Sequence, residues 1–276
     1  MKKLPLIIFE KSDTNFILFN NDALSQTLMK EKDWEPHFKD VIQRVLFSGD
    51  SAIDLGANFG YHTVSMASLV GNQGKIYAFE PLRIIFQQLC CNCFINGLDN
   101  VYPYNCAVGD ASSTAYMRSL DYYSTTTINI GDTSLLNNVD KAPGDEIMVK
   151  ALDSFDLKKI KFIKIDVQGC ELFALKGAKD TIDRDRPIMF IEIEEHQCRK
   201  FGYTSEDLIE YLFSIGYYLL RIKTNYPCDH IALPLEKESE ESLFHGMPYH
   251  VEKLKGKKIE LTFTNPIYYN QFKILE

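Results

Sequence analysis

A glycine-containing turn after a short apolar run carries the clearest chemistry in this chain. The run 51–55 leads into residues 56–60, which begin and end with glycine, and Tyr61 opens a segment with helical character. Glycines at a strand-to-helix turn let the backbone approach a ligand closely. A second apolar run, 75–79, ends at Glu80, and an acidic residue there is placed to hold the two hydroxyls of a ribose. These features predict a site for a nucleoside-bearing cofactor.

The glycine spacing distinguishes between cofactors. A dinucleotide site uses G-x-G-x-x-G, whose third glycine brings the helix N-terminus close to a pyrophosphate. Here three residues separate Gly56 from Gly60, and Asp54 lies just before the turn. A carboxylate there would repel a pyrophosphate but suits the ammonium and sulfonium groups of S-adenosylmethionine (SAM). SAM is therefore favoured over NAD, and an ordinary strand-turn-helix without a cofactor is the simpler alternative.

Polar residues able to act on an acceptor follow two later apolar runs. Asp166 ends the run 161–166, and Glu194, Glu195 and His196 follow the next one. A histidine with an ordinary pKa of ~6.5 can accept a hydroxyl proton near neutrality. Alternatively, Asp166 with Glu194 or Glu195 would hold a divalent cation that lowers the pKa of the acceptor hydroxyl. The alternative without chemistry is an Asp166 that caps the next helix and a solvated acidic loop with an exposed histidine.

Strands must alternate with helices to bring these residues together. A strand pair is expected within residues 4–20 and a helix at 35–46. Beyond them, we expect alternating strands (52–55, 75–79, 101–108, 161–166, 188–193 and 217–222) and helices (61–70, 83–95, from 171 onward and 205–214). Residues 109–147 interrupt this order as a polar insert, followed by a short strand at 147–150. A last strand near 230–234 closes the sheet. Residues 235–276 are mixed, with a charged run at 236–241 followed by aromatic-rich apolar pieces.

This alternation predicts an α/β fold, in which a mostly parallel, doubly wound sheet has helices on both faces. Ligands of such sheets bind outside the carboxyl ends of the strands, where the turn at 56–60, Glu80, Asp166 and His196 all fall. Glu171 lies in the first turn of a helix, whose dipole stabilises it whatever the function. The expected organisation is an N-terminal strand pair and helix (1–46), a cofactor-binding domain (47–235) and a C-terminal extension packed on the same domain (236–276).

Composition limits the class of protein. The chain has 276 residues, of which 45% are hydrophobic and 25% charged, and its net charge is −8. These values are ordinary for a soluble globular protein, and an acidic chain without a dense basic block argues against a nucleic-acid or anionic-membrane partner. No apolar run reaches the ~20 residues that span a bilayer. Seven cysteines without framework spacing predict reduced thiols and a cytoplasmic location.

A hydroxyl- and aromatic-rich stretch of the insert bears on the acceptor. Residues 122–127 comprise two tyrosines, a serine and three threonines, which suit the apolar ring faces and hydroxyl groups of a carbohydrate. An ordinary polar surface loop has the same composition, so both interpretations stay open. The favoured acceptor is a sugar or glycan-like molecule.

Several motifs together resemble the FkbM-type family of SAM-dependent methyltransferases. The likeness covers about residues 50–196, in the family's order. It is carried by DLGANFGY (54–61), YAFEP (77–81), NGLDNV (96–101), AVGD (107–110), LD (152–153), KIDVQG (164–169) and RPIMFIE (186–192). The resemblance implies a Rossmann-like class I methyltransferase fold and O-methylation of sugars or polyketide-type products. It also implies cofactor contacts by Gly56, Asn58, Gly60 and Glu80. Gln168 departs from the pattern, because the family usually carries Glu there.

These observations predict a SAM-dependent O-methyltransferase acting on a hydroxyl of a sugar or glycan-like acceptor. Glu80 would hold the ribose, the turn at 56–60 the methionine portion, and residues 105–108 the adenine edge. The predicted cofactor contacts are Asp54, Gly56, Ala57, Asn58, Gly60, Tyr61, Glu80, Pro81, Ala107 and Asp166, and the predicted catalytic residues are Asp166, Glu194 and His196. A methyltransferase of a non-sugar small molecule or a protein, and a non-catalytic binding protein with this fold, are the alternatives.

Overall fold

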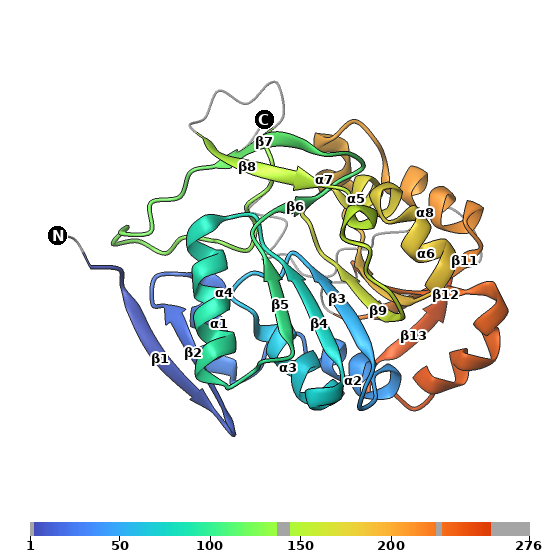
Figure 1. Cartoon of the computed structure of the whole chain (residues 1–276), viewed down its shortest axis with the longest axis horizontal. Helices are drawn as coiled ribbons and strands as arrows, with labels where there is room; N and C mark the ends of the chain where they lie inside the picture. Colours follow the sequence, from blue (N-terminus) through green and yellow to red (C-terminus); the bar gives the residue numbers. More distant parts are fainter. Residues whose placement is uncertain (1–2, 137–143, 225–227, 255–276) are drawn as a thin grey trace.

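An eight-stranded sheet forms the centre of the protein (Figure 1). The computed structural model describes residues 3–136, 144–224 and 228–254. In spatial order the strands are β13 (His250–Lys253), β11 (Tyr217–Lys223), β12 (Asp229–Pro234), β10 (Ile188–Glu192), β9 (Ile160–Ile165), β3 (Ser51–Leu55), β4 (Lys75–Phe79) and β5 (Val101–Tyr104). The strands from β10 to β5 are parallel to one another, whereas β12 runs antiparallel between β10 and β11. The predicted mostly parallel sheet is confirmed.

Helices cover both faces of this sheet, so the predicted doubly wound α/β fold is also confirmed. On one face, α2 (Pro36–Val45), α3 (Tyr61–Val70) and α4 (Arg83–Ile95) bury apolar side chains against the strands. On the other, α5 (Glu171–Gly177), α6 (Lys179–Asp185) and α8 (Ser205–Ser214) do the same. The central strands are apolar and buried for most of their length, as a sheet between two helical layers requires.

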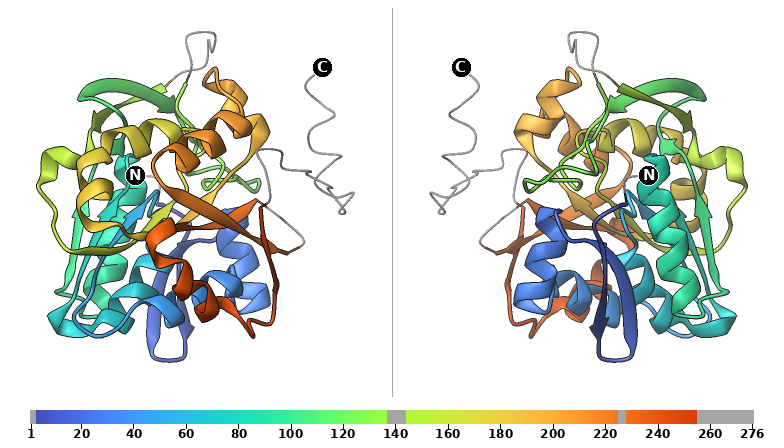
Figure 2. Two further views of the ribbon diagram at one scale, coloured as in Figure 1. Left: turned by 90° about the vertical axis from the view of Figure 1, so that its right-hand side faces the viewer. Right: turned by 90° about the vertical axis from the view of Figure 1, so that its left-hand side faces the viewer.

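The predicted N-terminal strand pair is confirmed as a hairpin of β1 (Leu6–Lys11) and β2 (Thr14–Phe19). It forms its own sheet and lies beside α4 (Figures 1 and 2). Gln88 and Asn92 of α4 bond to the backbone of Ile17, at 2.7 Å each, which ties the hairpin to the domain. The next helix, α1 (Ala23–Glu31), was not predicted, because Leu28 is its only buried apolar residue.

The prediction of one strand over 101–108 is wrong. β5 ends at Tyr104, and β6 (Ala107–Val108) belongs to a separate three-stranded sheet with β8 (Gly144–Lys150) and β7 (Ser113–Arg118). Between β5 and β6, Asn105 Nδ2 donates to the backbone carbonyls of Glu80 and Pro81, at 2.9 Å each, and holds the chain bent at this point. The polar insert contains a strand that was not predicted, β7. Its residues are mostly exposed, so the sequence lacks the apolar run that predicts a strand.

The prediction that the strand near 230–234 closes the sheet is also wrong. This strand, β12, is internal, and β13 forms the edge. β12 is buried along its whole length and pairs with β10 on one side and β11 on the other. Before β13 comes η3 (Leu235–Phe244), a 3-10 segment that contains the charged run 236–241.

Short helical segments complete the chain. α7 (Glu195–Lys200) occupies the predicted acidic loop after β10, and the 3-10 turns η1 (Gly71–Gln73) and η2 (Leu152–Phe155) join neighbouring elements. None of the helices in the described ranges combines the length and the apolar character that crossing a bilayer requires.

Candidate active site

A cavity lies at the carboxyl ends of the parallel strands. Its volume is about 580 Å³, within the range of small-molecule sites. Its wall includes residues that follow β3, β4, β9 and β10, together with parts of α1, α2 and the insert, and the first residue of β12. Segments far apart in the sequence thus meet where a doubly wound sheet places its ligands.

Gly56 fits the cavity wall because it has no side chain. Its φ is +76°, a left-handed conformation that favours glycine. A Cβ there would lie 1.8 Å from the backbone carbonyl oxygen of Asp166, so the chain segments following β3 and β9 approach each other backbone to backbone. Gly60 differs, because its Cβ would meet Leu89 of α4 at 2.6 Å. Gly60 therefore permits helix packing rather than the approach of a ligand.

Glu80 follows β4, and backbone amides fix its carboxylate. Oε2 accepts from Asn58 N at 3.0 Å, and Oε1 accepts from Leu82 N at 2.8 Å. The side chain is buried yet lines the cavity, and burial raises its pKa to about 7 despite the two amide donors. Each oxygen keeps a second lone pair. The carboxylate can thus still accept from the two hydroxyls of a ribose, as the sequence predicts.

Apolar side chains line the cavity next to Glu80, and they suit the flat face of an aromatic base. They are Leu82, Ile85, Cys106, Ala107 and Met117. Asn105 was predicted to lie at the adenine edge, but its side-chain amide is engaged with the backbone of residues 80–81. This side of the cavity therefore offers apolar surface, with Asn105 acting as its support.

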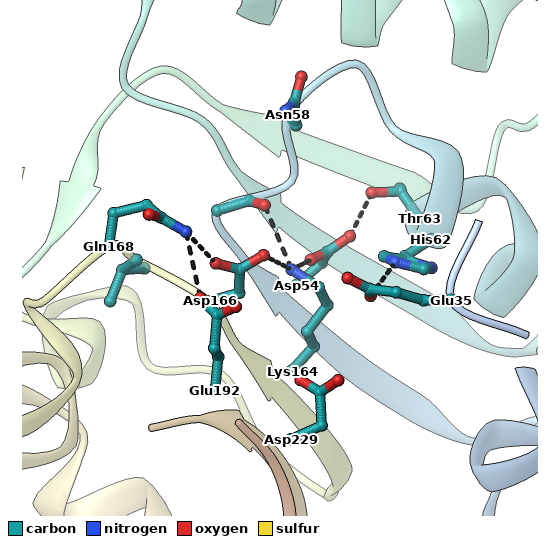
Figure 3. Close-up of polar contacts among 12 residues, drawn as sticks. Glu35, Asp54, Asn58, His62, Thr63, Lys164, Asp166, Gln168, Glu192 and Asp229 are labelled. Atoms are coloured by element: carbon teal, nitrogen blue, oxygen red, sulfur yellow. Dashed lines mark hydrogen bonds and ion pairs between the residues drawn. The ribbon is translucent and has the colours of Figure 1, made fainter. Parts of the chain in front are cut away.

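A buried lysine joins the ends of β3 and β9 (Figure 3). Lys164 Nζ lies 3.5 Å from Asp54 Oδ1, and 3.3 Å from both Asp166 Oδ2 and the Gly56 carbonyl oxygen. The other Asp54 oxygen accepts from Thr63 Oγ1 at 2.6 Å. Burial disfavours the charged lysine, but Asp166 and Asp54 outweigh it and hold the pKa of Lys164 above its ordinary value. Asp54 therefore positions Lys164.

Gln168 links two carboxylates in the cavity wall. Its Nε2 donates to Asp166 Oδ1 at 2.9 Å and to Glu192 Oε2 at 3.1 Å (Figure 3). Its Oε1 accepts from Gln197 Nε2 at 2.9 Å. The φ of Gln168 is +52°, and such strained non-glycine residues concentrate at functional sites. A Glu at this position, which the family resemblance leads us to expect, would place a third carboxyl group here.

Acidic residues crowd around Glu192. It lies directly opposite Asp229 on the neighbouring strand, an arrangement of like charges that costs stability. Burial, followed by the charges of Asp166 and Glu194, holds the pKa of Glu192 well above its ordinary value. Burial likewise raises the pKa of Asp229 to about 6, although Asp229 is bonded to His37. Strongly perturbed acids that face a cavity mark a candidate functional site.

Glu194 and His196 line the cavity at the start of α7, whereas Glu195 is not part of the described wall. Burial and the charge of Lys200 lower the pKa of His196. Glu195 instead accepts from Ser205 N at 2.7 Å and pairs with Arg199. Among the described residues, no group of three or more His, Cys, Asp and Glu side chains could hold a metal ion. The structure therefore gives no support to the predicted cation on Asp166 with Glu194 or Glu195.

The predicted site residues divide into two groups. Those that line the cavity are Gly56, Asn58, Glu80, Pro81, Ala107, Asp166, Glu194 and His196. Those that are not part of the described wall are Asp54, Ala57, Gly60, Tyr61 and Glu195. The predicted Asp166 cap on the following helix is absent, because its carboxylate bonds to Lys164 and Gln168.

Several residues of the site were not predicted. His37 and Asp229 lie outside the motif-bearing segment 50–196, and nothing in their local sequence predicts that they meet. Lys164 stands within one of the motifs. A lysine inside an apolar strand indicates a buried ion pair, so the sequence does contain a signal for this residue.

Besides Met117, the insert contributes residues 129–135 to the cavity wall, whereas 122–127 contribute none to the described wall. Tyr122 is buried against Phe19, with ring centroids 5.5 Å apart, and none of residues 122–127 belongs to the described wall. Asn129, Asp132, Thr133 and Ser134 do. The hydroxyl-bearing surface that faces the cavity is therefore a few residues beyond the predicted one.

Glu171 is structural, as expected. Its Oε1 accepts from Gly169 N at 3.0 Å and Val167 N at 3.3 Å. The Tyr203 hydroxyl lies 2.8 Å from the Gly169 carbonyl oxygen and 3.1 Å from Glu171 Oε2. This hydroxyl has one proton, so both contacts are hydrogen bonds only when Glu171 is protonated. Burial raises the pKa of Glu171 to about 7, which agrees with that requirement.

Comparison with known proteins gives three findings. The family model of the methyltransferase FkbM domain matches residues 54–219, more than half of the chain. "Methyltransferase 1" of Beauveria bassiana (strain ARSEF 2860) is 28% identical over 155 residues, which are 49% of this chain and 61% of that protein. The crystal structure of methyltransferase FkbM from Methylobacillus flagellatus KT has a TM-score of 0.47 and 20% identity, covering 67% of this chain and 44% of that one. The chain thus spans less than two thirds of the length of either relative.

Proposed function

Because the chain belongs to the methyltransferase FkbM domain family, we propose that it transfers the methyl group of SAM to a hydroxyl of a carbohydrate-like acceptor. The observation that carries this proposal is the single cavity that joins a glycine–carboxylate cradle to a cluster of acids and hydroxyls. Gly56 and Glu80 belong to the cradle, and Glu192, Glu194 and Asp229 to the cluster.

The cradle fits SAM. Gly56 has no Cβ, so the segments after β3 and β9 meet in the cavity wall, Glu80 presents two fixed oxygens, and the neighbouring wall is apolar. Glu80 would hold the ribose hydroxyls, and the apolar wall would hold the adenine. When bound, SAM supplies a methyl group on a positively charged sulfur, which the carboxylate of Asp166 would stabilise. Asp166 is itself held by Lys164 and Gln168.

The remaining wall favours a polyhydroxyl acceptor. Trp34 offers an aromatic face to an apolar ring surface, while Asn129, Thr133 and Ser134 offer neutral polar groups. Carboxylates such as Glu194 and Asp229 accept hydrogen bonds from hydroxyls. A sugar combines these properties, whereas a purely apolar acceptor would leave several acids unpaired at a cost in free energy.

The first experiment is calorimetric titration of the purified protein with SAM, with NAD as the control. Saturable SAM binding and no NAD binding are expected. The second experiment supplies SAM labelled on its methyl group with p-nitrophenyl glycosides, simple phenols and a lysine-containing peptide, with and without a chelator. Label on glycosides alone supports the proposal, and label on phenol or peptide alone refutes the carbohydrate acceptor. SAM binding without transfer to any acceptor would support the non-catalytic alternative.

A further inference from the structure

A histidine–aspartate pair lies in the cavity wall. His37 is in the first turn of α2, and Asp229 is the first residue of β12. Both line the cavity, and both are nine-tenths buried, with exposed fractions of 6% and 4%. His37 Nε2 is 2.7 Å from Asp229 Oδ2. A carboxylate bound to one ring nitrogen fixes the tautomer of a neutral imidazole, so Nε2 carries the proton and Nδ1 keeps its lone pair.

The second ring nitrogen is available to a ligand. Within the described part of the chain, Nδ1 of His37 makes no hydrogen bond. It is also not one of the enclosed polar atoms that lack a partner. Phe190 and Tyr249 lie against the ring, with centroids 6.0 and 5.7 Å away, and they restrict its orientation. An imidazole fixed in this way, with an open nitrogen at a cavity, has the geometry of a general base.

We propose that His37, oriented by Asp229, is the general base of the methyl transfer; this inference rests on the proposed hydroxyl acceptor. The acceptor oxygen forms a bond to the methyl carbon while the carbon–sulfur bond breaks, and that bond's electron pair stays on sulfur. The hydroxyl proton moves to His37 Nδ1, and Asp229 stabilises the imidazolium. The products are a methyl ether and S-adenosylhomocysteine, and the proton then leaves His37 for solvent.

The charges around His37 give the base a pH signature. Asp229 faces it from β12, Asp40 from α2 and Glu35 from the residue before α2, while Tyr249 lies against the ring. Burial disfavours the imidazolium, but these three carboxylates outweigh it and raise the pKa of His37. The neutral form needed to accept a proton prevails only above that pKa. Turnover should therefore rise with pH along a limb that lies above the ordinary value of ~6.5.

His196 is the competing base. It also lines the cavity, but about a third of its side chain is exposed, and its Nε2 lies 3.4 Å from Glu194 Oε2. That contact is longer than a normal hydrogen bond, so Glu194 orients the His196 ring less firmly than Asp229 orients His37.

The test compares four variants of the full chain: His37→Gln, Asp229→Asn, His196→Gln and His62→Gln. His62 provides the matched control, because its Nε2 pairs with Glu35 at 2.9 Å, it is largely buried, and it is not part of the described cavity wall. For each variant, kcat is measured against pH with methyl-labelled SAM and the best p-nitrophenyl glycoside, and SAM affinity is measured by calorimetry.

We expect His37→Gln to retain SAM affinity, to lose the acidic limb, and to lower kcat by about 10²–10⁴-fold, the range for a lost general base. Asp229→Asn should move the limb to lower pH, because His37 loses its nearest carboxylate. His62→Gln should keep kcat and an acidic limb, although the limb shifts in pH because Glu35, one of the carboxylates that face His37, loses its histidine partner. Retention of the limb in His37→Gln, or its loss in His196→Gln alone, would overturn the proposal. Failure of the wild type to methylate any hydroxyl would instead overturn the proposed function, and the base with it.

Discussion

Replacing Gly56 by Ala tests the central geometric claim about the cofactor cradle. Two costs add at this position. A left-handed backbone costs a non-glycine residue about 1–2 kcal/mol. The new Cβ would also lie 1.8 Å from the Asp166 carbonyl oxygen, where real contacts stay beyond 3.0 Å. Overpacking of this kind costs about 1–3 kcal/mol.

Gly97→Ala is the matched control for the backbone cost. Its φ is +65°, but a Cβ there would meet no described atom within 4 Å, so only the cost of about 1–2 kcal/mol applies. Urea unfolding should therefore show Gly56→Ala less stable than Gly97→Ala by about 1–3 kcal/mol.

SAM titration completes the test. Gly56→Ala should bind SAM at least about tenfold more weakly, equivalent to about 1.4 kcal/mol, because Asp166 and Gly56 must move apart in the cavity wall. Gly97→Ala should bind SAM like the wild type. Equal stability losses in the two variants, together with equal SAM affinity, would refute the reasoning from the close approach of the two chain segments.

Three further predictions follow from buried carboxylates and their partners. Glu80→Gln should weaken SAM binding by about 10–100-fold in calorimetry. Gln has one acceptor oxygen where Glu80 has two, and its NH₂ group accepts neither from a backbone N–H nor from a ribose hydroxyl. Hydrogen bonds to charged groups contribute about 1.5–3 kcal/mol, and unchanged affinity would remove Glu80 from the cofactor site. Lys164→Met should destabilise the fold by about 3–5 kcal/mol in urea unfolding, because buried Asp54 loses its counter-charge. Adding Asp54→Asn to this variant should restore part of the lost stability, and no restoration would contradict this reasoning. Because burial raises the pKa of Glu171 to about 7, its contribution to stability is complete below pH ~4.5 and is lost as pH rises through 7. The Tm of the wild type should therefore fall between pH 5.5 and 8 relative to that of Glu171→Gln, and parallel Tm profiles would show that Glu171 does not titrate there.

Elements with strong local signals were predictable from the sequence. α3, α4 and α8 were predicted with the bounds that the structure shows, because each follows a turn or a capping residue and carries apolar positions at helical spacing. The parallel strands were predictable for a related reason, since their unbroken apolar runs indicate burial on both faces.

The wrong strand predictions share one physical cause: the structure of these segments depends on distant parts of the chain. The place of β12 between β10 and β11 is set by the pairing of strands that are separated in sequence. β7 pairs with β8 and is mostly exposed, and its residues show neither an apolar run nor a strict alternation. Local patterns carry no information on such pairing.

The candidate site shows the same division. Gly56 and Glu80 were predictable, because a turn and the end of a strand specify their roles locally. His37 and Asp229 were not, because they are 192 residues apart and meet only after α2 packs on the face of the finished sheet. The structure gives no support to the predicted ligand roles of Asp54 and Glu195. Each of these carboxylates has a protein partner that the sequence does not reveal.

The internal position of β12 also constrains how the protein is made. β11 has hydrogen-bonded neighbours only in β12 and β13 among the described strands, and both leave the ribosome after it. Until residue 234 has emerged, β11 has no strand to pair with, and β10 presents an open apolar edge of the kind that chaperones shield. Asp229 is the first residue of β12, so assembly of the acidic cavity also waits for this strand. A partly synthesised chain would therefore bear the cradle for a cofactor before it could hold His37 in place.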